Sequence, residues 1–273
     1  MKLNELPLII EPEQLEPLLG DDNLQVIDLS RREQYAHLHL PGALHLDYGL
    51  IVRGQRPAPG LLPDPALLAR VLGALGLKRQ HHVVALDDEG GGKAARLLWT
   101  LDVIGHPHWS LLNGGMHAWA NEGHPVEGRA VQPTPGDYPV TYGDAPVATL
   151  DWIRDHLDDD DVRILDARTA EEYHGVKAFA ARAGHIPGAA NLDWMLTMDR
   201  ERNLRFRPEA ELRGLLEERG LTPDRQIVCH CQTHHRSSHS YVMLRALGYP
   251  RVKGYPGSWS EWGNTADTPV ETP

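Results

Sequence analysis

The sequence predicts an α/β protein made of two similar domains, each with a mainly parallel sheet flanked by helices. Its 273 residues exceed the roughly 100 to 150 that are typical of one domain. Two long stretches of the chain can be aligned with each other, which indicates an internal duplication. In each half, short β-branched runs alternate with helical patterns, as expected of parallel strands joined through helices.

The duplication is clearest around the motifs HLPGA and HIPGA. Residues 26–47 align with residues 164–193. The offset is 138 residues at Asp28 and Asp166 and 146 residues at the two motifs. The second copy therefore carries eight extra residues, which we place around 175–184.

A second pair of aligned stretches indicates where the two domains begin and end. Residues 83–127 align with residues 227–271 at an offset of 143 or 144. The stretch between the copies is rich in Pro and Gly, which is typical of an exposed linker. We expect a first domain over 1–128, a linker over 129–146 and a second domain over 147–273.

Charge and composition narrow the function. The formal net charge of -11 argues against general affinity for nucleic acid or for anionic membranes. The amino-terminal segment lacks the pattern of a signal peptide, and no apolar run reaches the roughly 18 residues of a membrane span. Only two cysteines occur, which is unlike a disulfide-stapled secreted domain. We expect a cytoplasmic protein that binds neither nucleic acid nor membrane.

The segment CQTHHRS is where we expect the chemistry. Residues 225–230 have the pattern of a buried strand, and residues 237–248 have an apolar helical face. Cys231 therefore lies at a turn from strand to helix, where backbone N–H groups and the helix terminus stabilise an anion. Such surroundings lower a thiol pKa into the range of roughly 3.5 to 7.5, which makes Cys231 a candidate nucleophile.

The two cysteines are given different roles. A free cysteine is often a small buried apolar residue, but the polar neighbours of Cys231 line an apolar core poorly. Cys229 lies inside the predicted strand, where packing is the expected role, although its nearness to Cys231 leaves a redox role open.

Two motifs give the chain a resemblance to the rhodanese family. The pattern Tyr35-x3-His39-Leu40-Pro41-Gly42-Ala43 resembles the amino-terminal family signature. The sequence GSWSEW over 257–262 resembles the carboxyl-terminal one. The resemblance covers both halves of the chain and implies two tandem rhodanese-like domains.

The resemblance also implies a site and an activity. Cys231 would carry a transferable sulfur as a persulfide, with neither a metal ion nor an organic cofactor. Arg168 would enter the donor pocket, and the loop residues would line it. The predicted site consists of catalytic Cys231 and of substrate-binding Arg168, Gln232, Thr233, His234, His235, Arg236 and Ser237.

The first copy is expected to be catalytically inactive. Asp87 stands where the second copy has Cys231, so no nucleophilic sulfur is available. The sequence GGGKAA that follows lacks the spacing of a phosphate-binding loop. Asp166 and the two motif histidines, His39 and His185, are expected to be structural.

The expected reaction is sulfur transfer from thiosulfate, or a related donor, to cyanide or a thiol. The loop CQTHHR differs from those of the best-known thiosulfate and mercaptopyruvate enzymes, which carry Arg-Lys-Gly or Gly-Ser-Gly after the cysteine. It resembles the loop of a bacterial branch of the family. The physiological donor stays open.

Three alternatives remain at this point. The pair His230-Cys231 followed by Arg236 resembles the loop of cysteine phosphatases, but it encloses four residues between Cys231 and Arg236 instead of five. Cys229, Cys231, His234 and His235 are also possible metal or redox ligands, at cramped spacing. A non-catalytic regulatory domain is the third alternative, and the intact Cys231 loop argues against it.

Overall fold

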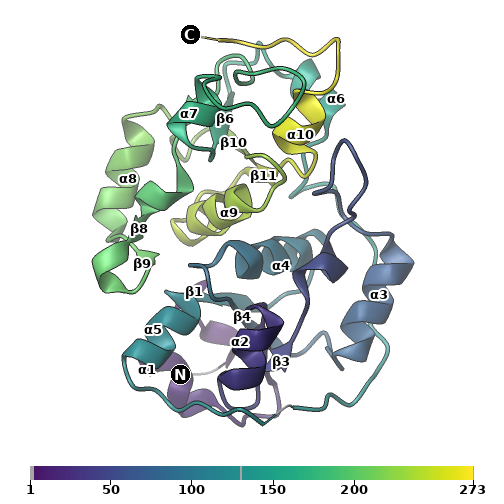
Figure 1. The fold of residues 1–273 in the computed structure, drawn as a ribbon, viewed down its shortest axis with the longest axis vertical. Helices are drawn as coiled ribbons and strands as arrows, with labels where there is room; N and C mark the ends of the chain where they lie inside the picture. Colours follow the sequence, from purple (N-terminus) through teal and green to yellow (C-terminus); the bar gives the residue numbers. More distant parts are fainter. Residues whose placement is uncertain (1–2, 130, 273) are drawn as a thin grey trace. The chain divides into compact units, whose positions relative to one another are not determined.

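The computed structural model describes residues 3–129 and 131–272, which form two compact units (Figure 1). Each unit holds one repeat together with a short segment from the other repeat. Unit 1 comprises residues up to Val52, Pro63–Gly143 and Met198–Phe206, and unit 2 comprises Arg53–Leu62, Asp144–Thr197 and the residues from Arg207 onward.

Unit 1 is built on a parallel sheet with the strand order β1-β5-β4-β2-β3. At its centre β2 (Leu24–Asp28) pairs with β4 (His82–Leu86), and every residue of β4 is buried, as expected for a strand covered on both faces. The other elements are η1 (Leu3–Glu5), β1 (Ile9–Ile10), α1 (Pro12–Leu15), η2 (Glu16–Leu18), α2 (Arg32–His37), β3 (Leu44–His45), η3 (Tyr48–Ile51), α3 (Pro65–Ala74), α4 (Gly92–Val103), β5 (Trp109–Leu112), α5 (Gly115–Asn121), β8 (Met198–Asp199), η5 (Arg200–Arg202) and β9 (Arg205–Phe206).

Unit 2 repeats this plan with the strand order β11-β10-β6-β7, again all parallel. Strand β10 (Gln226–His230) pairs with β6 (Val162–Asp166), which places Cys229 opposite Leu165. The other elements are α6 (Leu150–Asp155), α7 (Ala170–Tyr173), β7 (Ala190–Asn191), η4 (Trp194–Thr197), α8 (Glu209–Glu217), α9 (Arg236–Ala246), β11 (Val252–Gly254) and α10 (Ser258–Trp262).

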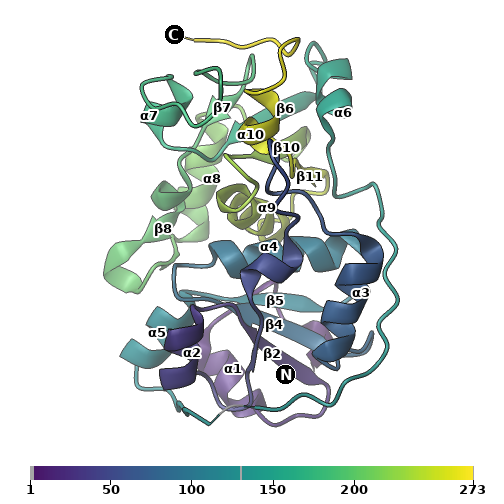
Figure 2. The ribbon, with the colours of Figure 1, turned by 45° about the vertical axis from the view of Figure 1, so that its right-hand side comes forward.

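The predicted fold class is confirmed. Within its own unit, α4 packs against β4 and β5, and α9 packs against β10 and β11 (Figures 1 and 2). The GSWSEW motif contributes Trp259 and Trp262 to the core of unit 2, beside Val228 of β10. That burial explains why the motif is aromatic.

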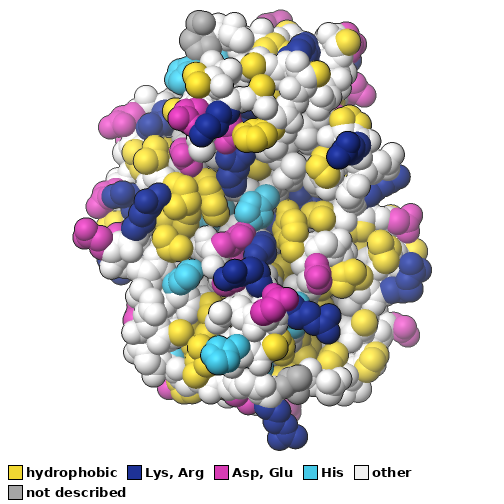
Figure 3. Space-filling model, viewed as in Figure 1, with side chains coloured by type: hydrophobic (Ala, Val, Ile, Leu, Met, Phe, Trp, Pro, Cys, Tyr) yellow, Lys and Arg dark blue, Asp and Glu magenta, His cyan; other side chains and the backbone are white. Residues whose placement is uncertain are grey.

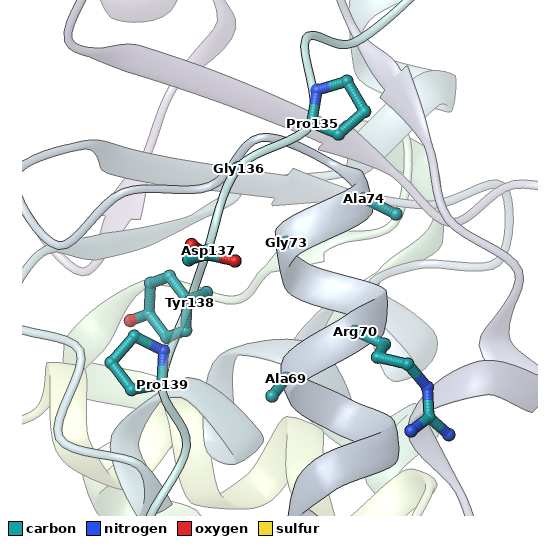
Figure 4. Close-up of a pocket in the computed structure, with 9 residues that line it drawn as sticks. All are labelled: Ala69, Arg70, Gly73, Ala74, Pro135, Gly136, Asp137, Tyr138 and Pro139. Carbon is teal, nitrogen blue, oxygen red and sulfur yellow. The ribbon is translucent and has the colours of Figure 1, made fainter.

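The segment predicted to be an exposed linker is partly packed in unit 1. Figure 2 shows the chain after α5 running past α3, and the Gly136 N–H donates to the Gly73 carbonyl at 2.8 Å. Tyr138 is buried, and its hydroxyl lies 2.7 Å from His106 Nδ1. Residues 135–139 and α3 border a pocket of about 650 Å³ (Figure 4). A Cβ at Gly73 would lie 2.4 Å from the Gly136 carbonyl oxygen, so this helix position requires glycine.

The surface is mixed in charge. On the face drawn in Figure 3, acidic and basic side chains lie among apolar ones. None of the helices formed by the described residues has the length and apolar character needed to cross a bilayer.

Candidate active site around Cys231

Cys231 follows the last residue of β10, at the carboxyl end of the parallel sheet of unit 2. Residues 231–235 form the loop, and α9 begins at Arg236. Cys231 is buried. Its N–H donates to Ser258 Oγ at 3.3 Å, and its carbonyl accepts from the Trp259 N–H at 2.9 Å. The GSWSEW motif therefore holds the backbone of Cys231, as well as filling the core.

Ser258 adopts a conformation that favours glycine. Its φ is +52°, whereas the equivalent residue of unit 1 is Gly115, with a φ of +54°. The serine hydroxyl donates to the Tyr255 carbonyl at 2.8 Å and accepts from Cys231. Backbone strain at a non-glycine residue persists only where its surroundings enforce it, and here the hydroxyl supplies the contact that a glycine could not. The sequence gives no signal for this role.

The loop favours the thiolate form of Cys231. Burial alone would raise the pKa of this thiol. The positive charge of Arg236, the Ser237 hydroxyl and the N–H groups of Ser237 and Thr233 outweigh that penalty, so the pKa of Cys231 is lowered. The predicted activation of Cys231 is in line with this environment.

The equivalent loop of unit 1 has a similar arrangement of backbone N–H donors, and the side chain of Asp87 accepts their hydrogen bonds. Asp87 accepts hydrogen bonds from the N–H groups of Glu89, Gly91 and Ala94 at 3.0, 2.8 and 2.9 Å. At the repeat offsets, Glu89 and Ala94 correspond to Thr233 and Ser237, whose N–H groups stabilise the Cys231 thiolate. The first copy thus fills its ring of donors with a carboxylate, where the second presents a thiol.

The other predicted loop residues differ in their surroundings. Gln232 Nε2 donates to the Phe179 carbonyl at 3.2 Å, in the segment that is inserted in the second repeat. His234 is buried with a φ of +55°, and its Nδ1 lies 2.7 Å from Ser237 Oγ. Thr233 is partly buried, and His235 lies edge-on to Trp194. The loop backbone and Ser237 are therefore best placed to meet a sulfur ligand.

Arg236 is paired with a carboxylate that the sequence analysis did not identify. Its Nη1 and Nη2 donate to the two carboxylate oxygens of Glu172 at 2.6 and 2.8 Å. The Glu172 side chain is only 5% exposed, so the pair is well shielded from solvent. The pattern Thr169-x-x-Glu172 could have identified the helix cap that Glu172 forms, but not its partner on α9.

A segment of the first repeat also contributes to unit 2. Within residues 53–62, a Cβ placed on Gly60 would lie 2.0 Å from the Thr233 carbonyl oxygen and 2.9 Å from that of Pro256. The segment therefore lies directly against the backbone of the Cys231 loop. Neither hydrophobic pattern nor local spacing predicts this contact.

Comparison with known proteins places the whole chain in one family. The model of the rhodanese-like domain matches residues 11–122 and again residues 149–265. The chain belongs to the rhodanese family. Its duplication is therefore a tandem pair of rhodanese domains, as the two signatures predicted.

Curated relatives of this rhodanese match nearly end to end. The chain is 48% identical over 268 residues to a thiosulfate sulfurtransferase of Pseudomonas aeruginosa, with 98% of each chain covered. It is 47% identical to a thiosulfate sulfurtransferase of Azotobacter vinelandii, with 97% of each covered. Among solved structures, the anaerobic ergothioneine biosynthesis enzyme of Chlorobium limicola shares the fold, with a TM-score of 0.86 at 21% identity. That match covers 100% of this chain and 72% of that one.

The rhodanese structure does not support the predicted donor-binding role of Arg168. The residue is 1% exposed, and its Nε and Nη2 donate to the Asp166 carboxylate at 2.6 to 3.0 Å. Nη2 also donates to the Gly184 carbonyl at 2.8 Å, and the guanidinium stacks 4.5 Å from the Trp259 ring centre. The side chain turns inward because Asp166, a buried carboxylate, needs a partner there.

The other residues taken as structural do pack into their domains. His39 and His185 stack on Tyr35 and Tyr173 at 4.0 and 3.7 Å, in equivalent positions of the two rhodanese domains. Cys229 is fully buried in β10. Its burial and, to a smaller extent, the negative charge of Cys231 raise the pKa of the Cys229 thiol.

The structure gives no support to the metal alternative at the CHCQTHH segment. Among the described residues, the ligand atoms close enough to hold an ion together belong to Glu13, Glu122 and His124. Those exposed glutamates lie in unit 1, where both pair with Arg205.

Proposed function

We propose that this rhodanese is a thiosulfate sulfurtransferase that carries sulfur as a persulfide on Cys231. The observation that supports this most strongly is the comparison of the two loops. Backbone N–H donors at equivalent positions surround the Asp87 carboxyl group in unit 1 and the Cys231 thiol in unit 2. Equivalent backbone donors therefore surround a carboxyl group in the first domain, where burial raises the pKa of Asp87, and a candidate nucleophile in the second domain only. The identity of 48% and 47% to two thiosulfate sulfurtransferases, over nearly the whole of each chain, supports the same activity.

The first half-reaction forms the persulfide. The Cys231 thiolate attacks the outer sulfur of thiosulfate, a new S–S bond forms, and the S–S bond of thiosulfate breaks. Sulfite leaves with the electron pair of that bond, and Arg236 and the loop N–H groups offset the negative charge. Buried surroundings suit the product, because a persulfide exposed to water would be lost to other nucleophiles.

The second half-reaction returns the enzyme to its thiolate. Cyanide or a thiol attacks the outer sulfur of the persulfide, the S–S bond breaks, and its electron pair returns to Cys231. Every step is a displacement at sulfur, so the cycle balances without a metal ion or an organic cofactor. The proposed substrate-binding residues are those of the loop and the start of α9, namely Gln232, Thr233, His234, His235, Arg236 and Ser237.

The proposed compartment is the cytoplasm. Both cysteines are free, and a reactive thiol persists where the surroundings are reducing. Fractionation of the native cell, followed by immunodetection of the chain, tests this compartment.

Steady-state kinetics with single cysteine variants test the proposed nucleophile. Cys231→Ser should abolish transfer from thiosulfate to cyanide, because the hydroxyl cannot form a persulfide. Cys229→Ala, the matched control two residues earlier, in β10, should keep most of the activity. Equal loss in both variants would show that the two thiols act together and would overturn the proposal.

A further inference from the structure

Glu172 stands in direct contact with the cation that serves the nucleophile. Among the charged groups acting on Cys231, Arg236 has the largest effect in stabilising its thiolate. The same guanidinium donates a hydrogen bond to each carboxylate oxygen of Glu172. The Glu172 carboxylate and the Cys231 thiolate therefore share one cation, Arg236.

The geometry of this pair restricts what Arg236 can bind. A guanidinium recognises an oxyanion best through two parallel hydrogen bonds. Glu172 already accepts one hydrogen bond from each Nη nitrogen. It therefore occupies the edge of the guanidinium that would otherwise bind an oxyanion. Its negative charge also repels any anion that approaches the loop.

We propose that Glu172 is a positioning residue that sets the charge of the Cys231 loop by offsetting part of the positive charge of Arg236, and that it thereby weakens the binding of oxyanions. The loop then stabilises an anionic sulfur without retaining sulfite or competing sulfate and phosphate. This inference deepens the proposed function, since it rests on Cys231 as the reacting group.

Two further charged residues act on the pair of Glu172 and Arg236. Burial raises the pKa of Glu172, and the hydrogen bond and charge of Arg236 lower it. The charge of Arg168 also lowers the pKa of Glu172. Asp166 acts on Arg236 from β6. Both Arg168 and Asp166 are buried and unchanged in the variant described next.

The test replaces Glu172 by glutamine. Glu172→Gln keeps the shape of the side chain and an oxygen that can accept from Thr169, so α7 retains its cap. Glu171→Gln is the matched control, because it removes the same charge from the neighbouring residue. Glu171 is exposed and pairs with Lys177 instead.

Two measurements on folded protein follow. The ultraviolet absorbance of the thiolate, taken as the difference from a Cys231→Ser background, gives the thiol pKa without any donor present. Glu172→Gln should lower that pKa by about one unit, because Arg236 is no longer offset. Inhibition of sulfur transfer by inorganic sulfate should strengthen roughly 10-fold, as expected when a charge-assisted contact becomes available. Glu171→Gln should change neither.

The opposite outcomes are distinguishable. If Glu172 only keeps Arg236 in place, Glu172→Gln will leave the thiol pKa unchanged or raise it, and sulfate inhibition will not strengthen. Either result overturns the inference. The thiolate measurement requires no sulfurtransferase activity, so failure of the proposed function and failure of this inference remain separate.

Discussion

Two cysteines separated by a single residue show how much the surroundings decide thiol chemistry. Cys229 is fully buried in the central strand β10, where burial disfavours its thiolate. Cys231 is equally buried but receives hydrogen bonds from Ser237 and Thr233 and the charge of Arg236. Burial therefore makes a thiol inert in one position and supports a nucleophile in the other.

We predict that Arg168→Ala destabilises the protein. Removal of the guanidinium takes away the charged partner of the buried Asp166 carboxylate, which keeps the backbone N–H of residue 168 and the nearby His230, and breaking such a buried pair costs about 3 to 5 kcal/mol. Urea unfolding should show this loss in the free energy of unfolding. Arg154→Ala, which removes an exposed ion pair in the same unit, should cost less than about 1 kcal/mol.

A different result would support the predicted role of Arg168 in binding the sulfur donor. Arg168→Ala would then keep its free energy of unfolding but would lose roughly 10- to 150-fold in kcat/KM for thiosulfate. Transfer from a preformed persulfide to cyanide would change less.

Sequence reasoning placed Cys231 and Asp87 at equivalent positions of two loops but did not identify the residues that surround Cys231. Cys231 and Asp87 were predictable because both follow a strand pattern at equal positions of a repeat. The inward direction of Arg168 depends on Asp166 and on the distant Gly184 carbonyl, which no local pattern encodes. Glu172 was missed for the same reason, since its partner lies 64 residues away.

At the scale of elements, each unit takes in the corresponding segment of the other repeat. The hairpin of β8 and β9 belongs to unit 1, where Arg205 pairs with Glu11 at 2.6 Å and a Cβ on Gly90 would meet Met198 Sδ at 2.8 Å. Residues 53–62 belong to unit 2 and contact the backbone of the Cys231 loop. Each of the two equivalent loops is therefore bordered by a segment of the other repeat.

We predict that Gly60→Ala lowers sulfur transfer by roughly 10- to 100-fold, because the added methyl must displace the Thr233 carbonyl and shift the loop. Gly54→Ala is the control in the same segment, since nothing lies within 4 Å of its Cβ. Transfer kinetics and urea unfolding should be measured on both variants. Equal activity in the two would show that the 53–62 segment does not position the loop.

The elements themselves were largely predictable. The strand expected at 225–230 is found as β10, and the short β-branched runs of the two halves form β2, β4 and β6. These strands are apolar and central, so local pattern and tertiary burial agree. The exchange of the two segments was not predictable, because short polar connections carry no periodic signal that names a partner.

At the scale of the whole molecule, buried histidines link stability to pH. Burial lowers the pKa of His82, His106 and His230 to about 4 and that of His239 to about 3. In the unfolded chain these groups take up protons near pH 6.5. Their stabilising effect is therefore complete above about pH 6.5 and is lost as the pH falls toward 4.

We predict that the free energy of unfolding decreases as the pH is lowered from 7 to 5. His230 and His239 each contribute at most about 1.4 kcal/mol per pH unit in that range. Asp28 and Asp87 oppose the trend, because burial raises their pKa values and favours the folded state at low pH. Urea unfolding at a series of pH values measures the balance, and an unfolding midpoint that rises between pH 7 and 5 would contradict it.

The central claim is that Cys231 carries the transferred sulfur, and the mass of the intact protein tests it most directly. Incubation with thiosulfate should add the mass of one sulfur atom, and fragmentation should place that atom on Cys231. Subsequent cyanide should remove it and release thiocyanate in equal amount. Sulfur that is absent after thiosulfate, or found on Cys229 or on any residue of the first repeat, would contradict the account.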